Sequence, residues 1–250
     1  MQVEFLEKIE RNLQAENEAY LATLVSETDS SLALEMGDKV LIAEKEVHLS
    51  GPVNDKLKTR LSNKLIPAGK NKRQGLLELE ICQQNLQFYL QPLQASPNLY
   101  IFGAGHVSSP LAKIAELAGF KVVVIDDRQE LMTSDRFPEQ VSFHQESYQE
   151  FLEDFQAQPQ DYIVIVTPGH LHDYEVIKNV ISQDWKYLGM IGSSRKVNMI
   201  FSELQEETGI SAEKLKRVDA PIGVDIGSET PEEIAISIAA ALVSARRCEN

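Results

Sequence analysis

The chain has 250 residues, 43% hydrophobic and 25% charged, which is enough for one large or two modest hydrophobic cores. Its formal net charge of −14, with no local cluster of Lys and Arg, repels phosphate backbones and excludes nucleic acid as an expected partner. The sequence has no apolar run of about 18 residues or more, so no transmembrane helix and no membrane partner are expected.

The first part of the chain, residues 1–95, is predicted to be a smaller, mixed α/β domain. It opens with an amphipathic helix at 2–16 that lacks the features of a signal peptide, so a cytoplasmic location is expected. Alternating apolar residues and turn signals predict the elements that follow. These are a strand at Tyr20–Ser26, short strands at Lys39–Ala43 and Glu46–Leu49, a helix at Asp55–Leu65 ended by Pro67 and Gly69, and a hairpin of Gly75–Cys82 and Leu86–Leu93.

The second part, residues 97–250, alternates strands and helices after the Pro-containing boundary at 95–97. This rhythm predicts right-handed βαβ crossovers and a Rossmann-like parallel sheet. The predicted strands are Asn98–Phe102, Lys121–Ile125, Val141–Phe143, Tyr162–Thr167 and Tyr187–Ile191, and the predicted helices are Val107–Ala118, Asp173–Ser182 and Arg195–Thr208.

A final helix is signalled by Thr230 as N-cap, Pro231 as first residue and Glu233 as capping-box partner. Its run IAISIAAALVSA is apolar on nearly every side. Such a helix is either deeply buried or placed at a subunit interface.

The glycine turn FGAGHVSS, directly after the first strand of this domain, predicts a phosphate site. Gly103 allows a tight turn, and Gly105 lets the backbone approach a pyrophosphate. His106 lies in the turn, and Ser108 is small enough for close packing of helix on strand. The helix that follows directs free N–H groups at the phosphates, although a turn that has lost its ligand is the alternative.

The second strand ends in Asp126, where an acid would bind ribose hydroxyls. The acid favours a ligand with an unphosphorylated ribose. Arg128 nearby could instead pair with a ribose 2′-phosphate, so a phosphorylated ribose remains an alternative.

Two further segments are expected at the same edge of the sheet. TPGHLHD places His170, His172 and Asp173 after a strong strand, where they could contact a ligand, hold a metal or shuttle a proton; alternatively, Asp173 caps the next helix and His172 is merely exposed. MIGSSRK places Gly192, Ser193 and Arg195 at a helix start, suited to an anion or, for the serine, to a plain N-cap.

The loop APIGVDIGSETPEE holds Asp225 between two glycines and is expected to line the site or only to stabilise the turn. Cys82 is expected in a buried strand and Cys248 as a terminal thiol, without a disulfide framework. His48 and His144 are expected at the surface. No metal site is assigned.

The blocks FGAGHVSSPLAKIAELAGFKVVVIDDR, RFPE, TPGHLHD, YLGMIGSSRK and APIGVDIGSETPEEIAISIAAALVSARR resemble, in order and spacing, the xanthine dehydrogenase accessory (XdhC/CoxI) family. The resemblance implies a maturation factor for a molybdenum hydroxylase rather than a classical enzyme. Such a factor would bind the molybdenum pterin cofactor, possibly in its dinucleotide form, support its sulfuration with a sulfurtransferase and deliver it to the apo-enzyme. It also implies a homodimer.

The N-terminal part departs from the family pattern. Where the family usually carries a GGC-type segment, this chain has HLSGPVNDKL, with Gly51 and Pro52 and no cysteine. If that cysteine handles sulfur or molybdenum in the family, this chain cannot do so in the same way. Two other functions compete: an NAD(P)-binding oxidoreductase and a non-catalytic nucleotide-binding scaffold.

Overall fold

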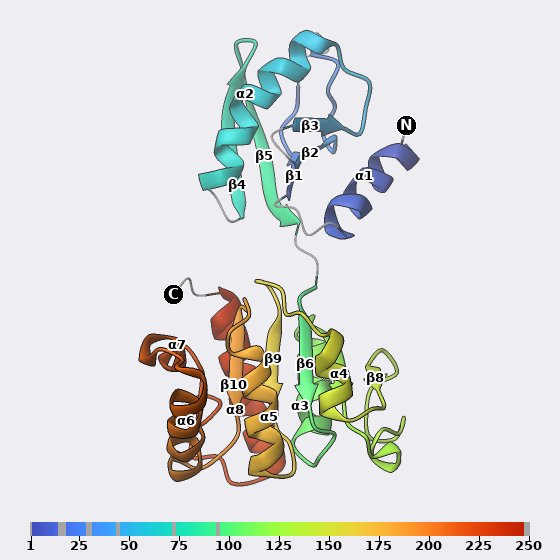
Figure 1. The fold of residues 1–250 in the computed structure, drawn as a ribbon. Helices are drawn as coiled ribbons and strands as arrows, with labels where there is room; N and C mark the ends of the chain where they lie inside the picture. Colours follow the sequence, from blue (N-terminus) through green and yellow to red (C-terminus); the bar gives the residue numbers. More distant parts are fainter. Residues whose placement is uncertain are drawn as a thin grey trace. The chain divides into compact units, whose positions relative to one another are not determined.

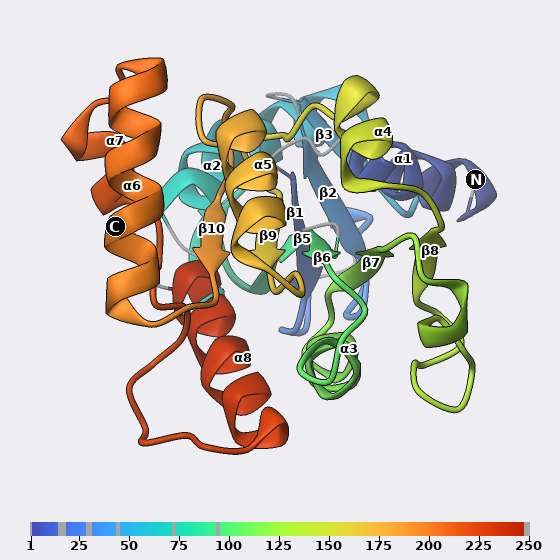
Figure 2. The ribbon, with the colours of Figure 1, turned by 60° about the horizontal axis from the view of Figure 1, so that its bottom comes forward.

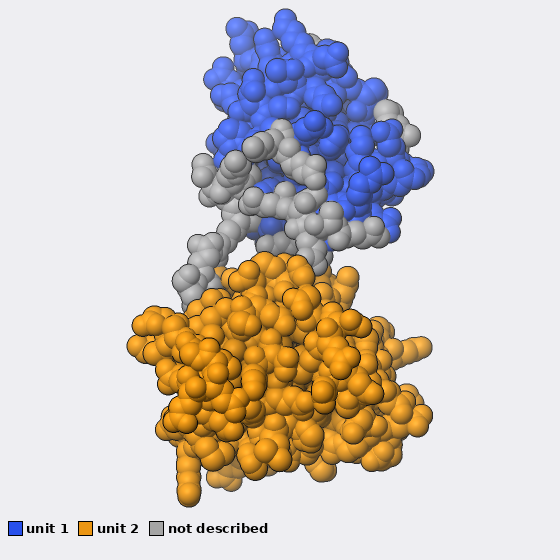
Figure 3. Space-filling model, in the orientation of Figure 1, with its two compact units in different colours: residues 1–95 blue, residues 96–250 orange. Residues whose placement is uncertain are grey.

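The computed structural model describes residues 2–14, 19–28, 32–43, 46–71, 74–93 and 96–247. By its internal contacts the chain divides into two compact units, residues 1–95 and residues 96–250 (Figures 1 and 3). Within the described residues, no helix combines the length and hydrophobicity needed to cross a bilayer.

The N-terminal unit is an antiparallel sheet in the order β3-β2-β1-β5-β4, with one helix on each face. Alternate strand residues point to opposite faces. Leu57, Leu61 and Leu65 of one helix pack on one face, and Phe5 of the other packs on the opposite face. The elements are α1 (Gln2–Gln14), β1 (Ala19–Leu24), β2 (Lys39–Ala43), β3 (Glu46–Leu49), α2 (Asp55–Asn71), β4 (Gly75–Ile81) and β5 (Gln84–Leu93).

Two predictions for this unit are wrong. Helix α2 continues through Pro67 to Asn71. Proline has no amide hydrogen to donate to the carbonyl of Asn63, four residues earlier, but Asn63 is exposed, so water can hydrogen-bond that carbonyl instead. Cys82 is exposed rather than buried, since β4 ends at Ile81 and Cys82 starts the hairpin turn with φ of 53°. Residues 15–16, predicted to extend the first helix, and Cys248 lie outside the described residues.

The C-terminal unit is a five-stranded parallel sheet in the order β10-β9-β6-β7-β8, which confirms the predicted Rossmann-like fold class. The strands are β6 (Asn98–Phe102), β7 (Lys121–Ile125), β8 (Ser142–His144), β9 (Tyr162–Ile165) and β10 (Tyr187–Met190). The helices are α3 (Ser108–Leu117), the short 3₁₀ helix η2 (Gln129–Leu131), α4 (Tyr148–Asp154), α5 (His170–Val180), α6 (Ser194–Thr208), α7 (Ala212–Lys216) and α8 (Pro231–Arg247).

Helices cover both faces of this sheet, so the four residues of β9 are all buried. Figure 2 shows α3 and α8 on one side and α4, α5 and α6 on the other. Beyond β10, residues 218–222 run alongside it, with a parallel bridge between Gly189 and Asp219. A β-carbon on Gly189 would lie 2.4 Å from Ile222, which explains the glycine in an otherwise apolar strand.

The predicted capping box of α8 is confirmed. The amide of Glu233 donates to Thr230 Oγ1 at 3.3 Å, and the amide of Thr230 donates to Glu233 Oε2 at 3.0 Å. The helix is buried on one face only, because Ile236 remains 52% exposed while Ile238 is fully buried against α3.

Candidate functional site

The segments singled out in the sequence lie at one edge of the C-terminal sheet. All five strands are parallel, so the loop after each strand leaves at the same, carboxyl, edge, which Figure 2 turns toward the reader. From β6, the next strands in the chain, β7 and β8, are added on one side of the sheet, whereas β9 and then β10 are added on the other side. The carboxyl ends of these two strands therefore flank the crevice where open α/β sheets bind ligands.

The glycine turn after β6 is held by protein contacts on several sides. Gly103 has φ of +110°, and a β-carbon there would lie 2.5 Å from the carbonyl oxygen of Val166. Ser108 Oγ donates to the Gly103 carbonyl, and an Arg136 guanidinium nitrogen donates to the Gly105 carbonyl at 3.0 Å. A β-carbon added at Gly105, by contrast, would have no described atom within 4 Å. Protein contacts therefore hold the turn at Gly103, and the turn is open at Gly105.

Asp126, at the end of β7, is fully buried and is engaged by the protein itself. Its Oδ2 accepts from the Ala104 amide at 2.7 Å, from Arg128 at 2.6 Å and from the Tyr148 hydroxyl at 3.3 Å. Its Oδ1 accepts from the Arg128 amide and side chain at 3.0 and 2.7 Å. The carboxylate thus fixes the glycine turn, and of its partners Arg128 is half-exposed.

This network sets the pKa of Asp126. Burial alone would raise it, but the hydrogen bonds from Arg128 and from the Ala104 amide outweigh burial and hold the pKa below the usual value of an aspartate. A carboxylate with a lowered folded-state pKa stabilises the fold above its unfolded-state pKa, and loses that effect as pH falls through the folded-state value.

Asp126→Asn is accordingly expected to lower the free energy of unfolding at pH 7 by about 2 kcal/mol, because the new amide group faces hydrogen-bond donors. Urea unfolding of the full chain measures this loss. The difference from the wild type should shrink as pH falls below about 4, where the carboxylate of the unfolded wild-type chain takes up protons, and it should be lost once pH falls through the lower folded-state pKa of Asp126. A difference independent of pH would show that the charge of Asp126 does not support the turn.

The two helices that start at the crevice lack side-chain caps. Val107 precedes α3 and Gly169 precedes α5, and neither start has a side-chain capping bond. By contrast, Ser147, Ser193, Ser211 and Thr230 cap α4, α6, α7 and α8. Within the described chain, the amides of residues 105–109 and 170–172 donate to no protein acceptor. Uncapped helix N-termini with free amides are suited to an anion.

The histidines of the second segment remain separate from its acid. His170 is exposed, and the ring of His172 lies 5.3 Å from that of Tyr148. Asp173 is fully buried one turn inside α5 and so does not cap that helix; it forms an ion pair with Lys196, and its Oδ1 lies 2.6 Å from the Thr167 hydroxyl. In the part of the chain that the structure describes, no three His, Cys, Asp or Glu side chains gather as metal ligands.

The sequence did not single out the Asp173–Lys196 ion pair, which joins α5 to α6. Gly192 makes room for it, since a β-carbon there would lie 3.0 Å from Lys196 Cδ. The signal in the sequence for this pair was Gly192, which precedes Lys196 at the predicted start of a helix. Arg136 was likewise missed, although it lies in the RFPE block.

The remaining predicted residues follow β10 in the chain, not the two strands that flank the crevice. Ser193 accepts from the Lys196 amide at 3.3 Å and so acts as the N-cap of α6. Arg195 is exposed, with no ion pair or hydrogen bond from its guanidinium among the described residues. Asp225 is exposed and accepts only a weak bond from the Gly227 amide at 3.4 Å, within its own turn.

The C-terminal unit matches a known domain family. The family described as the XdhC Rossmann domain matches residues 99–242, which is more than half of the chain and includes the crevice. The chain belongs to the XdhC family. This confirms the resemblance carried by the five sequence blocks.

Two curated proteins are similar to this chain in sequence. YqeB of Escherichia coli (strain K12) is 35% identical over 151 residues, and a probable xanthine dehydrogenase subunit of Bacillus subtilis (strain 168) is 32% identical over 171 residues. The matches cover 60% and 68% of this chain, but only 27% and 49% of those relatives. The chain therefore spans about half, or less, of the length of these relatives.

A crystal structure described as a xanthine dehydrogenase from Bacillus halodurans shares the fold. Its TM-score is 0.57 at 18% identity, with 98% of this chain and 96% of that one covered.

Proposed function

We propose that this XdhC-family chain is a cytoplasmic maturation factor for a molybdenum hydroxylase of the xanthine dehydrogenase type, which binds the molybdenum pterin cofactor and delivers it to the apo-enzyme. The observation that carries this proposal is the pair of uncapped helices at the crevice between β6 and β9. Their free amides present a site for the phosphate or diphosphate of that cofactor.

The residues around the crevice fit an anionic cofactor. The open space at Gly105 leaves room for a phosphate against the backbone. His106, Arg128, His170 and Arg195 are exposed or half-exposed polar groups on the same edge. Under the proposal, the amides bind the phosphate, and these side chains orient the remainder of the cofactor. When bound, the cofactor supplies the molybdenum that the hydroxylase uses.

The partner proposal is supported by the name of one relative, a probable xanthine dehydrogenase subunit. Sulfuration by a sulfurtransferase would need a sulfur carrier other than the HLSGPVNDKL segment, which has no cysteine. The exposed Ile236 and Val243 on the outer face of α8 are where we propose that a homodimer would form.

The competing oxidoreductase function is disfavoured by Asp126. To bind the ribose hydroxyls of NAD, that carboxylate needs a free oxygen facing the crevice. Here it is fully buried, and both oxygens accept bonds from protein donors.

The experiment is to express the chain together with a molybdenum hydroxylase and to measure the molybdenum and pterin that co-purify with it. Close to one cofactor per chain, and no binding of NADH in equilibrium dialysis, are expected. Binding of the apo-hydroxylase by a chain that never carries pterin would instead favour the scaffold, and tight NADH binding would favour the oxidoreductase.

A further inference from the structure

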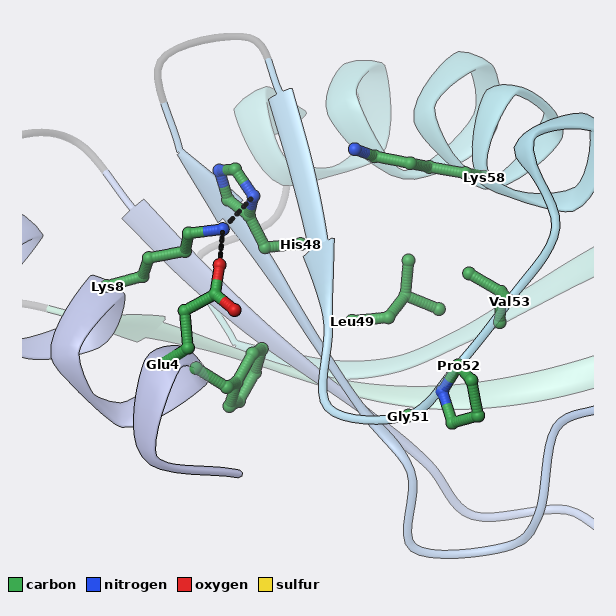
Figure 4. A pocket seen from close by; sticks show the side chains of 9 residues that line it. Glu4, Lys8, His48, Leu49, Gly51, Pro52, Val53 and Lys58 are labelled. Carbon is green, nitrogen blue, oxygen red and sulfur yellow. Dashed lines mark hydrogen bonds and ion pairs between the residues drawn. The ribbon is translucent and has the colours of Figure 1, made fainter. Parts of the chain in front are cut away.

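The N-terminal unit contains a second concave site, at the edge strand β3. A pocket of about 260 Å³ lies there between α1, the end of β3 and the start of α2 (Figure 4). Its volume is below the range of about 300–1,000 Å³ that is usual for drug-sized ligands, so it suits a small ligand or a single chemical group.

The ionisable groups of the pocket are two ammonium groups, one imidazole and one carboxylate. Lys8 from α1, His48 from β3 and Lys58 from α2 line the pocket; Figure 4 shows Lys8 beside His48, and Lys58 extending from α2 on the other side of the β3 ribbon. Lys8 Nζ lies 3.1 Å from Glu4 Oε1 and 3.4 Å from His48 Nδ1. The ammonium of Lys58 makes no ion pair or hydrogen bond with any described residue.

This concentration of positive charge contrasts with the net charge of −14 of the whole chain. An acidic protein repels anions over most of its surface, so a pocket with two ammonium groups is a local exception. Glu4 is the one carboxylate lining the pocket, and it is already paired with Lys8. The charge of Lys58 is therefore left to attract a ligand.

We infer that this pocket binds a small tetrahedral oxyanion, either free or as the phosphate of a monoester. Lys58 and Lys8 would supply the ionic contacts, and His48 would donate a ring hydrogen. The site is separate from the crevice of the C-terminal unit and does not depend on the function proposed for it.

His48 makes the binding pH-dependent. Burial, and then the ammonium of Lys8, hold the pKa of His48 below the usual value of a histidine, so the ring is neutral at pH 7. The charged groups that face it are Lys8 and Glu4 from α1, Lys58 from α2 and Glu46 on its own strand, 3.8 Å away. A bound anion favours the protonated ring, so affinity should rise as pH falls toward 5.

The test is a sulfate titration of the full chain followed by the NMR resonances of the His48 ring, assigned by their loss in His48→Gln. Sulfate is used because it keeps its charge from pH 5 to 8. A saturable shift, absent with chloride at equal ionic strength, is expected, together with a higher pKa of His48 in sulfate. Methyl phosphate should bind as well, and tighter binding than sulfate would identify a monoester as the ligand.

Three variants make the test specific. Lys58→Gln should weaken sulfate binding about fivefold, and Glu4→Gln should strengthen it by freeing Lys8. Lys56→Gln, on the same helix but outside the pocket, should leave it unchanged, as should Gly105→Val in the other unit. Equal affinities of the Lys58→Gln and Lys56→Gln variants, or a His48 shift that does not saturate, would overturn the inference.

Discussion

Gly105→Val is expected to weaken binding of the molybdenum pterin cofactor about a hundredfold while leaving the fold intact. No described atom lies within 4 Å of the position that a β-carbon would take at Gly105, and its φ is not positive, so the protein itself tolerates a side chain there. The branched side chain would instead occupy the space over the free amides at the start of α3. Equilibrium binding and thermal unfolding of the same preparation measure the two effects.

The matched control is Ala212→Val, at the exposed start of α7, outside the crevice and outside the α8 face proposed for the homodimer. It adds the same side chain and should change neither affinity nor melting temperature appreciably. Normal cofactor binding by Gly105→Val would remove the glycine turn from the site. A loss of binding accompanied by unfolding would show that Gly105 serves the fold.

Gly103→Ala should have the opposite signature, a loss of stability of about 4 kcal/mol that combines backbone strain with overpacking. Its φ of +110° is unfavourable for alanine, and the new β-carbon would lie 2.5 Å from the Val166 carbonyl oxygen. The loops after β6 and β9 would have to separate at the crevice. Urea unfolding of the full chain measures the loss.

Comparison with Gly119→Ala separates the loss of stability caused by the close contact with Val166 from the loss caused by backbone strain. Gly119, after α3, also has a positive φ, of +84°, but open space around its α-carbon. Strain alone should cost about 1.5 kcal/mol there. Equal losses in the two variants would contradict the tight packing between Gly103 and the β9 loop.

The sequence predicted most of the C-terminal unit, because its signals are local. The apolar strands at 98–102 and 121–125 agree with β6 and β7, and the capping box at Thr230 and Glu233 starts α8 as expected. Strand–helix alternation then leaves few topologies. Element ends were less predictable: α5 begins at His170, three residues before Asp173, since Gly169 rather than the acid precedes the helix.

The sequence predicted at which edge of the sheet the candidate segments lie, but only part of their internal bonding. The sequence placed Asp126 at the end of β7, but not that Ala104, Arg128 and Tyr148 would satisfy it. Those contacts join residues up to 22 positions apart, and a helix or strand pattern contains no information about them. The same reason hid the Asp173–Lys196 pair and the pocket beside His48.

The most direct test of the account is the amide NMR spectrum of the C-terminal unit, in the full chain, during anaerobic addition of the molybdenum pterin cofactor. Free amides at the starts of α3 and α5 are the groups proposed to bind its phosphate. The largest shifts are predicted at residues 105–109 and 170–172, and they should disappear in Gly105→Val. Cofactor binding that leaves those amides unchanged, or no binding at all, would contradict the central claim.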